Sequence, residues 1–332
     1  MTRAPIALSL GDPAGIGPEI VVAAWRLLRR SGPVFAVVGD AATLAGVSGA
    51  TVCPIAAMAD AGVAFEHALP VIDIPLAAPA TPGTPSPAAA PQIIAWIETA
   101  ARLALTGEAC AVVTAPIAKA PLYEAGFAFP GHTEFLGVLA PPGDADARGP
   151  IMMLAAADLR VSLVTIHEPL ARVPGLLNID LIVNAGLVTA RALHRDFGIA
   201  VPRLAVTGLN PHAGESGAIG REEVEIIMPA VAALRDLGVN ASGPHPADSL
   251  FHPDARKTYD AALCMYHDQA LIPVKMLDFW GGVNITLGLP VVRTSPDHGT
   301  GFDIAGKGVA RADSLIAALR AAAQIAAHRA RV

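Results

Sequence analysis

The stretch IALSLGDPAGIGPEI, Ile6 to Ile20, contains the change of local structure that sets the fold. Its first five residues, Ile6–Leu10, form a short apolar run that is typical of a buried strand. The loop Gly11–Gly17 follows, and a helix is predicted to start near Pro18, because proline suits the first turn of a helix. A strand that passes through a short loop into a helix is the basic unit of α/β proteins.

The same alternation continues through most of the chain. Apolar runs predict further strands at Val34–Val38, Ala111–Thr114, Ile151–Leu154, Val161–Thr165, Leu204–Thr207, Ala262–Tyr266 and Val283–Leu287. Helical patterns predict helices at Ile93–Leu105, Leu181–Phe197, Glu222–Leu237 and Leu315–Ala327. The Pro-rich segment Pro75–Pro91 is predicted to be an exposed loop without helix or strand. The sequence therefore predicts an α/β fold with a largely parallel sheet, and its 332 residues suit about two domains.

Composition and charge argue against several classes of protein. The hydrophobic fraction of 53% is ample for folded cores, and a net charge of −6 without any run of Lys or Arg disfavours a nucleic-acid or membrane partner. No long charge-free apolar segment lacks Pro and Gly, so we expect no transmembrane helix, and the N-terminus indicates a strand and not a signal peptide. Three scattered cysteines, Cys53, Cys110 and Cys264, are typical of reduced thiols in a cytoplasmic protein.

Three histidines, His167, His212 and His267, each come shortly after a predicted strand. Ligands of open α/β sheets bind beyond the carboxyl ends of the strands, where such side chains collect. Taken singly, each is a hydrogen-bonded loop histidine, but the repeated placement favours a common site, formed through the sheet or where two subunits meet. Three imidazoles without a thiolate suit Zn²⁺ or a similar divalent ion and leave positions open for substrate. Glu168 and Asp268 either support these histidines or are solvated charges.

A possible anion site lies in PGHTEFL, Pro130 to Leu136. Thr133 is a good N-cap and Glu134 suits the first turn, so a helix is predicted to begin beside His132. Free N–H groups at a helix N-terminus bind anions, although an ordinary capped helix explains the same residues equally well.

A second polar group combines two cations and an amide. Lys275, Asn284 and Arg293 suit the recognition of phosphate or carboxylate, unless they are surface groups. The chain has four lysines against nineteen arginines. Lys275 therefore also suits a task that Arg cannot perform, the transfer of a proton.

Two common nucleotide-binding motifs are absent. No GxGxxG follows the first strand, so the ordinary dinucleotide fingerprint is missing. GFDIAGKG, Gly301 to Gly308, has the spacing of a phosphate-binding loop but ends in glycine where Ser or Thr is needed. Without the hydroxyl group that binds Mg²⁺, the segment does not indicate a nucleoside triphosphatase.

Five longer motifs carry a family resemblance. They are LSLGDPAGIGPEI, TAPIAKAPLYEAGFAFPGHTEFLG, GLNPHAGESGAIGREE, MYHDQALIPVK and GVNITLGLPVVRTSPDHGTGFDIAGKG. Together, from about residue 6 to residue 310, they resemble the 4-hydroxythreonine-4-phosphate dehydrogenase family of vitamin B6 biosynthesis. The resemblance implies a homodimer with an isopropylmalate-dehydrogenase-like fold, in which each subunit has two α/β domains and an active site in the cleft between them.

The resemblance also implies domain bounds and cofactors. A first domain, on the cofactor side, is expected over residues 1–130 and 285–332, and a second, with the metal site and the dimer interface, over 131–284. The GDPAGIGPE loop is similar to the GDGIGPE loop of related decarboxylating dehydrogenases, so NAD, or NADP, is expected at Asp12, Gly15 and Gly17. The expected metal is Zn²⁺, with Mg²⁺ or Co²⁺ as alternatives.

The roles of the site residues are carried over position by position. The family's metal ligands fall on His167, His212 and His267. Its substrate contacts fall on His132, Thr133, Lys275, Asn284 and Arg293. Lys275 and Asp248 are the expected catalytic residues, and the metal site is expected to draw histidines from both subunits. His245 departs from the family, which more usually has Leu at this position, and an extra imidazole there would alter substrate preference.

The implied reaction oxidises the C3 hydroxyl of 4-phosphooxy-L-threonine with NAD⁺ and then releases CO₂, giving 3-amino-2-oxopropyl phosphate. The nearest alternative is the same chemistry on threonate or erythronate 4-phosphate. More distant alternatives are a non-redox metal enzyme, such as an acyltransferase or hydrolase, and a binding protein without activity. The intact set of three histidines with Lys275 disfavours the binding protein.

Overall fold

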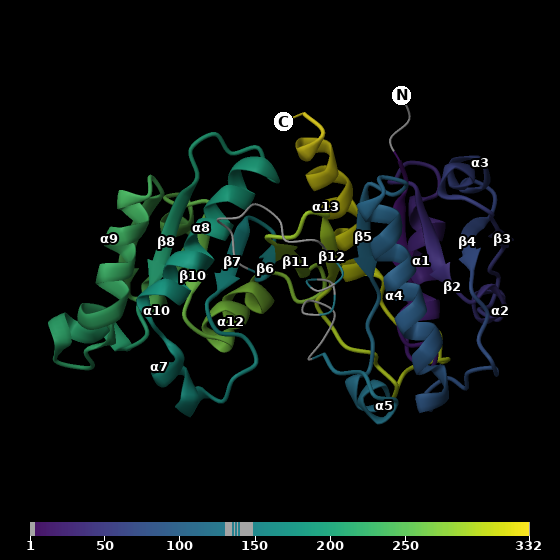
Figure 1. Cartoon of the computed structure of the whole chain (residues 1–332), viewed down its shortest axis with the longest axis horizontal. Coiled ribbons are helices and arrows are strands. Elements are labelled where there is room, and N and C mark those ends of the chain that lie inside the picture. Colours follow the sequence, from purple (N-terminus) through teal and green to yellow (C-terminus); the bar gives the residue numbers. More distant parts are fainter. Residues whose placement is uncertain (1–3, 130–134, 136, 138, 140–148, 332) are drawn as a thin grey trace. The chain divides into compact units, whose positions relative to one another are not determined.

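The structure is a computed structural model that describes residues 4–129, 135, 137, 139 and 149–331. The chain forms two compact units, which are shown in Figure 1. Unit 1 comprises Met1–Pro142 and Leu289–Ala327, and unit 2 comprises Gly143–Gly288 and His328–Val332. The domain bounds expected from the sequence lie after residues 130 and 284, and the bounds of the two units lie after residues 142 and 288.

Within the described residues, unit 1 has six strands in the order β3-β4-β2-β1-β5-β12. Every neighbouring pair among them is parallel. The strands are β1 (Ile6–Ser9), β2 (Phe35–Gly39), β3 (Val52–Pro54), β4 (Leu69–Asp73), β5 (Ala111–Thr114) and β12 (Arg293–Pro296). The central strands β1, β2 and β5 are buried along their whole length, which explains their uninterrupted apolar sequences.

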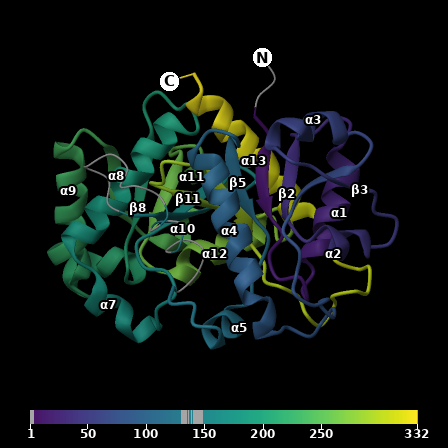
Figure 2. The same ribbon diagram turned by 45° about the vertical axis from the view of Figure 1, so that its right-hand side comes forward.

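Two long helices of unit 1 border this parallel sheet. α1 (Gly17–Leu28) follows β1 and has proline in its first turn, as predicted. α4 (Ala90–Leu105), blue in Figures 1 and 2, packs against β1, β2 and β5. Its buried Trp96 donates an indole hydrogen bond of 2.9 Å to the carbonyl of Ile74, just after β4. The other helices are α2 (Ala41–Ala45), η1 (Met58–Asp60), α3 (Ala61–Ala64), η2 (Pro87–Ala89), α5 (Lys119–Glu124) and α13 (Asp313–Arg329).

The described part of unit 2 also has six strands, in the order β11-β6-β7-β10-β8-β9. β6 runs antiparallel to β11 and β7, whereas β7, β10, β8 and β9 are parallel to one another. The strands are β6 (Ile151–Ala156), β7 (Leu159–Leu163), β8 (Arg203–Thr207), β9 (Asn240–His245), β10 (Ala261–Cys264) and β11 (Val283–Leu287).

Helix α12 (His267–Leu277) covers the core of unit 2. Its Ala270 and Val274 are fully buried in one apolar cluster with side chains of β6, β7 and β10. Burial of a Val or Leu side chain, such as Val274, contributes about 1.5–3 kcal/mol to stability. The apolar cluster therefore holds α12 against the sheet. The other helices are η3 (Leu170–Arg172), α7 (Val173–Leu176), α8 (Ile179–Arg195), η4 (Pro211–Gly217), the π-helix η5 (Glu223–Ile227), α9 (Met228–Asp236), α10 (Ala247–Leu250) and α11 (Pro253–Arg256).

The predicted α/β class is confirmed, with corrections to single elements. β10 ends at Cys264, two residues before the predicted end, and His267 is the first residue of a helix and not the tip of a strand. The helix predicted at Glu222–Leu237 is a π-helix followed by α9. Prolines occupy the first turns of η2 and α4, where they are tolerated, so the predicted loop Pro75–Pro91 ends early, at Ser86.

Among the described residues, no single helix has the length and hydropathy needed to cross a membrane. Two consecutive helical segments, Leu170–Leu176 and Ile179–Arg195, reach this length and hydropathy only when they are taken together, and they are bent by 95° relative to each other.

Candidate functional site

The three histidines predicted to bind metal follow neighbouring strands of unit 2. β10 lies between β7 and β8 and is parallel to both, so the carboxyl ends of these strands reach the same edge of the sheet. His167 comes after β7, His212 after β8 and His267 after β10. One edge of one sheet therefore carries all three side chains.

His167 and His267 are adjacent at this edge. Their ring centroids are 5.7 Å apart and their planes make an angle of 43°. The two rings line a cavity of about 230 Å³. The other residues that line it are Ile166, Glu168, Leu170, Val173, Tyr266 and Asp268. Two imidazoles on the wall of a cavity suit a divalent ion and a small polar ligand.

A carboxylate beside His267 restricts the orientation of its imidazole ring. Nδ1 of His267 lies 2.8 Å from Oδ1 of Asp268. With the proton on Nδ1 donated to Asp268, the lone pair of Nε2 is available, as it is in most metal-binding histidines. Of the two interpretations of the neighbouring carboxylates, support of a histidine fits Asp268, whereas Glu168 forms an ion pair with Arg172 at 3.3 Å.

His212 occupies an exposed position on the turn η4. Five successive residues, His212 to Ser216, have φ angles between 44° and 76°, and four of them carry a Cβ atom. In the part of the chain that the structure describes, no three His, Cys, Asp or Glu side chains are grouped closely enough to hold a metal ion. A single chain thus brings together two of the three predicted ligands, His167 and His267.

The predicted substrate and catalytic residues of unit 2 lie on different elements. Lys275 is on α12, with Nζ 5.2 Å from the centre of the Phe279 ring, a distance typical of a cation–π contact. Asn284 is on β11, and its buried Oδ1 has no hydrogen-bond partner among the described residues. Such an acceptor is costly to bury without a donor, which fits a ligand that supplies one. Asp248 is exposed on α10.

The remaining predicted substrate contacts belong to other parts of the chain. Arg293 is on β12 of unit 1, where its side chain is buried and Nη2 donates a hydrogen bond of 2.8 Å to Oγ1 of Thr114. His132 and Thr133 lie outside the described residues.

The loop predicted to contact the cofactor joins β1 to α1. Two of its glycines are required by close backbone approaches. A Cβ atom on Gly15 would lie 2.7 Å from the carbonyl oxygen of Thr300, and one on Gly17 would lie 2.6 Å from that of Leu10. Side chains are excluded at both positions, so the loop folds tightly against its neighbours.

Asp12 is the buried acidic residue of the same loop, with 3% of its surface exposed. Its Oδ1 accepts a hydrogen bond of 3.0 Å from the N–H of Ala14. Burial raises the pKa of the Asp12 carboxyl above its usual value, and hydrogen bonds from the backbone of Ala14 and Ala118 act in the opposite direction. A buried carboxyl group with a raised pKa in a tight loop is typical of functional sites.

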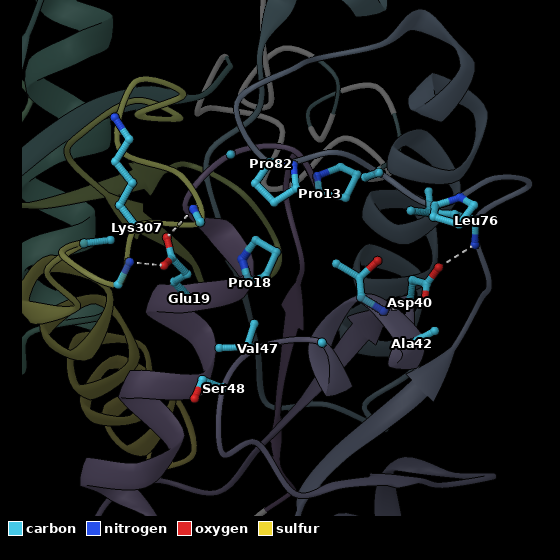
Figure 3. Close-up of a pocket in the computed structure, with 18 of the residues that line it drawn as sticks. Pro13, Pro18, Glu19, Asp40, Ala42, Val47, Ser48, Leu76, Pro82 and Lys307 are labelled. Carbon is cyan, nitrogen blue, oxygen red and sulfur yellow. Dashed lines mark hydrogen bonds between the residues drawn. The ribbon is translucent and has the colours of Figure 1, made fainter.

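This loop borders a pocket of about 1000 Å³ in unit 1 (Figure 3). Pro13, Pro18 and Pro82 give it apolar walls, and Val47 and Ala42 lie at its lower side in the view of Figure 3. A large pocket with apolar walls and a few polar groups is typical of sites for organic cofactors.

Two acidic residues shape this pocket without having been singled out from the sequence. Glu19, in the first turn of α1, accepts hydrogen bonds from the N–H groups of Gly306 at 3.1 Å and Gly308 at 2.7 Å, as Figure 3 shows. Asp40 accepts one of 2.8 Å from the N–H of Leu76. The GFDIAGKG segment, excluded above as a phosphate loop, is thus a wall of this pocket. Its link to Glu19 spans 287 positions, and no local pattern reveals it.

The sequence also matches a known family profile, that of "Pyridoxal phosphate biosynthetic protein PdxA", over residues 32–322. The chain belongs to the PdxA family. The match includes all three histidines, Lys275, Asn284 and Arg293, and it confirms the resemblance found in the motifs.

PdxA relatives match along almost the whole chain. The 4-hydroxythreonine-4-phosphate dehydrogenase of Caulobacter vibrioides is 66% identical over 331 residues, which is 99% of each chain. The solved structure of that dehydrogenase from Klebsiella pneumoniae is 40% identical, with a TM-score of 0.86 over 98% of this chain and 100% of that one. A terephthalate 1,2-cis-dihydrodioldehydrogenase from Burkholderia xenovorans is 29% identical, with a TM-score of 0.65 over 97% and 98% of the two chains. This PdxA chain is therefore an oxidoreductase of a family that serves pyridoxal phosphate biosynthesis.

Proposed function

We propose that this chain oxidises 4-phosphooxy-L-threonine at C3 with NAD⁺, in a reaction that requires a divalent metal ion. The hydride of C3 passes to NAD⁺ and the hydroxyl proton is released. The β-keto acid that results loses CO₂ and becomes 3-amino-2-oxopropyl phosphate. The observation that carries this proposal is the adjacent pair His167 and His267, with Asp268 bonded to the second ring.

His167, His212 and His267 would hold the metal ion, for which Zn²⁺ is the first candidate and Mg²⁺ and Co²⁺ are the alternatives. When bound, the ion supplies a Lewis acid for the hydroxyl group that is oxidised and for the negative charge that develops as CO₂ leaves. Asp268 would accept the Nδ1 proton of His267, which leaves the lone pair of Nε2 for the ion and limits rotation of the ring.

The polar residues would bind the anionic ends of the substrate. The expected contacts are His132, Thr133, Lys275, Asn284 and Arg293. Lysine and arginine bind phosphate and carboxylate groups strongly. The buried Oδ1 of Asn284, which has no donor in the described part of the chain, would accept a hydrogen bond from the amino group of the substrate.

Two residues are proposed to move protons. Lys275 carries a side chain that can change its protonation state, which Arg cannot do, and it lies on the same helix as His267. Asp248 is exposed to solvent on α10 and would exchange protons with water.

NAD, with NADP as the alternative, is assigned to the pocket of unit 1. Its volume of about 1000 Å³ is ample for a large part of a dinucleotide, and the loop with Asp12, Gly15 and Gly17 borders it. Gly15 lines this pocket, and the missing side chains of Gly15 and Gly17 let the loop pack against Thr300 and Leu10, which would give a ligand a fixed wall. The proline walls would contact the flat face of a base.

A homodimer is proposed as the active form, in which His212 of one subunit joins His167 and His267 of the other. Within the described residues, one chain alone groups two of these rings, and His212 is exposed. Large apolar side chains on α12 and directly after it are also exposed, which is typical of a protein interface. They are Ile272 at 62%, Met276 at 82%, Phe279 at 60% and Trp280 at 50%.

The second candidate function is the same chemistry on threonate or erythronate 4-phosphate. His245 favours it. This residue ends β9, and its backbone carbonyl accepts a hydrogen bond of 2.8 Å from the N–H of Gly208. It is therefore beside the strand end that leads to His212. A polar ring in place of the leucine that the resemblance implies would favour a more hydroxylated substrate.

The test is to incubate the purified chain with NAD⁺, with Zn²⁺, Mg²⁺ or Co²⁺, and with each candidate phosphate, while NADH fluorescence is followed. We expect NADH from 4-phosphooxy-L-threonine, and a loss of turnover and of bound metal of at least about 100-fold in His267→Ala. His194→Ala is the matched control, because His194 is an exposed histidine on α8 whose ring contacts the carbonyl of Ile199.

Each other outcome has a definite meaning. NADH from threonate or erythronate 4-phosphate alone would establish the second candidate. A His267→Ala variant that remains fully active without metal would refute the metal site, and no NADH from any of the phosphates would refute the oxidation.

A further inference from the structure

The turn that carries His212 has an unfavourable backbone conformation. Residues 212–216 all adopt left-handed φ angles, which L-amino acids other than glycine avoid because of contacts between Cβ and the backbone. Such a conformation persists where surrounding groups determine it, and it is frequent at functional sites. The groups that hold this turn are therefore of interest.

Glu223, the first residue of η5, lies inside the turn with 1% of its surface exposed. Its Oε1 accepts hydrogen bonds of 2.7 Å from the N–H groups of both Leu209 and Asn210. Its Oε2 accepts one of 2.9 Å from Nδ2 of Asn210. Two residues before the turn, Leu209 and Asn210, thus donate three hydrogen bonds to one buried carboxylate, whose charge strengthens each bond.

Two glycines leave the space that this carboxylate occupies. A Cβ atom on Gly214 would lie 2.5 Å from Oε2 of Glu223, and one on Gly208 would lie 3.1 Å from Oε1. The backbone on both sides of His212 therefore closes directly around the Glu223 carboxylate.

Gln269 connects this turn to the helix of His267. It lies two residues after His267 on α12 and is 8% exposed. Its Nε2 donates a hydrogen bond of 2.7 Å to the carbonyl of Gly208. Its Oε1 accepts bonds of 2.8 Å from Oγ1 of Thr207 and of 2.7 Å from the N–H of Met265. One side chain thus joins the end of β8 to the end of β10.

We propose that Glu223 and Gln269 are positioning residues that set the place of His212 relative to the strand ends and to α12. This inference rests on the proposed role of His212 as a metal ligand. Both side-chain types are needed for chemical reasons. The carboxylate accepts from three donors, and the amide of Gln269 accepts at one end and donates at the other.

The test measures zinc affinity by competition with a chelator, using the full chain, and the Tm of the metal-free protein. Glu223→Gln turns an amide N–H toward Nδ2 of Asn210, and Gln269→Glu loses the donor to Gly208. We expect each variant to weaken zinc binding by about 10- to 100-fold. The two variants alter different bonds, so either one carries the test if the other does not fold.

Glu222→Gln is the matched control. Glu222 is the neighbouring glutamate, and its carboxylate accepts one side-chain hydrogen bond, of 2.7 Å, from the same Nδ2 of Asn210, besides bonds from the backbone of Arg221 and Glu222. It is less buried than Glu223 and contacts no backbone N–H of residues 208–210 in the described structure. We expect its zinc affinity to stay within about 2-fold of the wild type, because the turn keeps all its bonds to Glu223.

A double-mutant comparison separates positioning from general stabilisation. In a His212→Ala background, Glu223→Gln should cause no further loss of zinc affinity, because the ligand that it positions is gone. A lower Tm with unchanged zinc affinity in both Glu223→Gln and Gln269→Glu would make these residues merely structural and overturn the inference. Unchanged zinc affinity in His212→Ala itself would instead refute the proposed metal ligand, and the inference with it.

Discussion

His267 illustrates how a single residue acquires its role from its neighbours. Its Nδ1 is bonded to Asp268, its ring faces His167 at 5.7 Å between centroids, and Gln269 two positions later ties its helix to β8. An imidazole whose ring and helix are both held by such contacts loses little conformational entropy when it binds an ion.

His245 offers a prediction that depends on pH. Burial lowers the pKa of its ring below the usual value of 6.5, and the positive charge of Arg235 lowers it further. The unfolded chain therefore takes up a proton at higher pH than the folded chain does. The stability that neutral His245 contributes is present above about pH 6.5 and is lost as the pH falls through the folded-state pKa.

We expect His245→Leu to remove this part of the pH dependence. Its free energy of unfolding, measured by urea denaturation, should fall less than that of the wild type between about pH 7 and pH 5. Parallel curves for the two proteins would show that the His245 ring titrates alike in both states, contrary to its burial.

The sequence indicates candidate metal ligands more readily than the residues that hold them in place. Histidines after apolar runs are visible to the eye, whereas nothing local distinguishes Glu223 from Glu222. The partners of Glu223 lie 13 and 14 positions away, and two of those of Gln269 lie 61 and 62 positions away. Burial and such distant contacts arise from the folded chain as a whole.

At the scale of elements, α12 shows where sequence patterns are ambiguous. The apolar run before His267 was predicted to be strand as far as Tyr266, but β10 pairs with its neighbours up to Cys264. Pro273 inside α12 also obscures the helix, because proline normally interrupts helices. Short apolar runs do not reveal where pairing stops, since the lengths of neighbouring strands decide it.

The turn η4 gives a prediction about backbone strain. Ala213 has a φ of 51°, so Ala213→Gly removes a left-handed alanine that costs about 1–2 kcal/mol, and it adds chain entropy worth roughly 0.5–1 kcal/mol to the unfolded state. The free energy of unfolding should stay equal or rise by up to about 1.5 kcal/mol. Gly214→Ala should lower it by about 2 kcal/mol or more, because its Cβ meets Glu223.

Urea denaturation of both variants checks these values. Gly175→Ala is the control, since a Cβ atom there meets nothing within 4 Å and its backbone is helical. Gly214→Ala with wild-type stability would contradict the conformation of the turn.

At the scale of the whole molecule, the class of fold was predictable because strands and helices alternate along the chain. Among the strands of the described residues, β3, β4, β9 and β12 escaped prediction, and the last two have sequences that are not typical of strands. β9 reads NASGPH, which is typical of a turn, and β12 reads RTSP, whose polar side chains are buried through hydrogen bonds such as that of Arg293 with Thr114. Their place in the sheet follows from neighbours far away in the sequence.

Shared metal sites would make subunits complement one another. In a mixed dimer of His212→Ala and His267→Ala chains, one of the two sites retains all three histidines. Random pairing places half of the chains in mixed dimers, so about a quarter of wild-type activity should return, although each variant alone is inactive. An NADH assay of the unseparated co-expressed mixture measures this, and mixed dimers purified through two different tags should show about half of wild-type activity.

The pair His167→Ala and His267→Ala is the control for this experiment. Both residues would serve the same site from the same chain, so their mixed dimers have no intact site and should stay inactive. Failure of the first pair to recover activity would show that each site is built from one chain.

The hydrogen bonds of Gln269 and Glu223 have one more consequence if the dimer is as proposed. His212 and His267 of one polypeptide then belong to different metal centres. The hydrogen bonds of Gln269 and Glu223 connect the turn that carries His212 to the helix that carries His267. Each chain then connects the two metal centres of the dimer through these hydrogen bonds. A substitution of Gln269 in one chain alone would therefore affect both metal centres of the dimer.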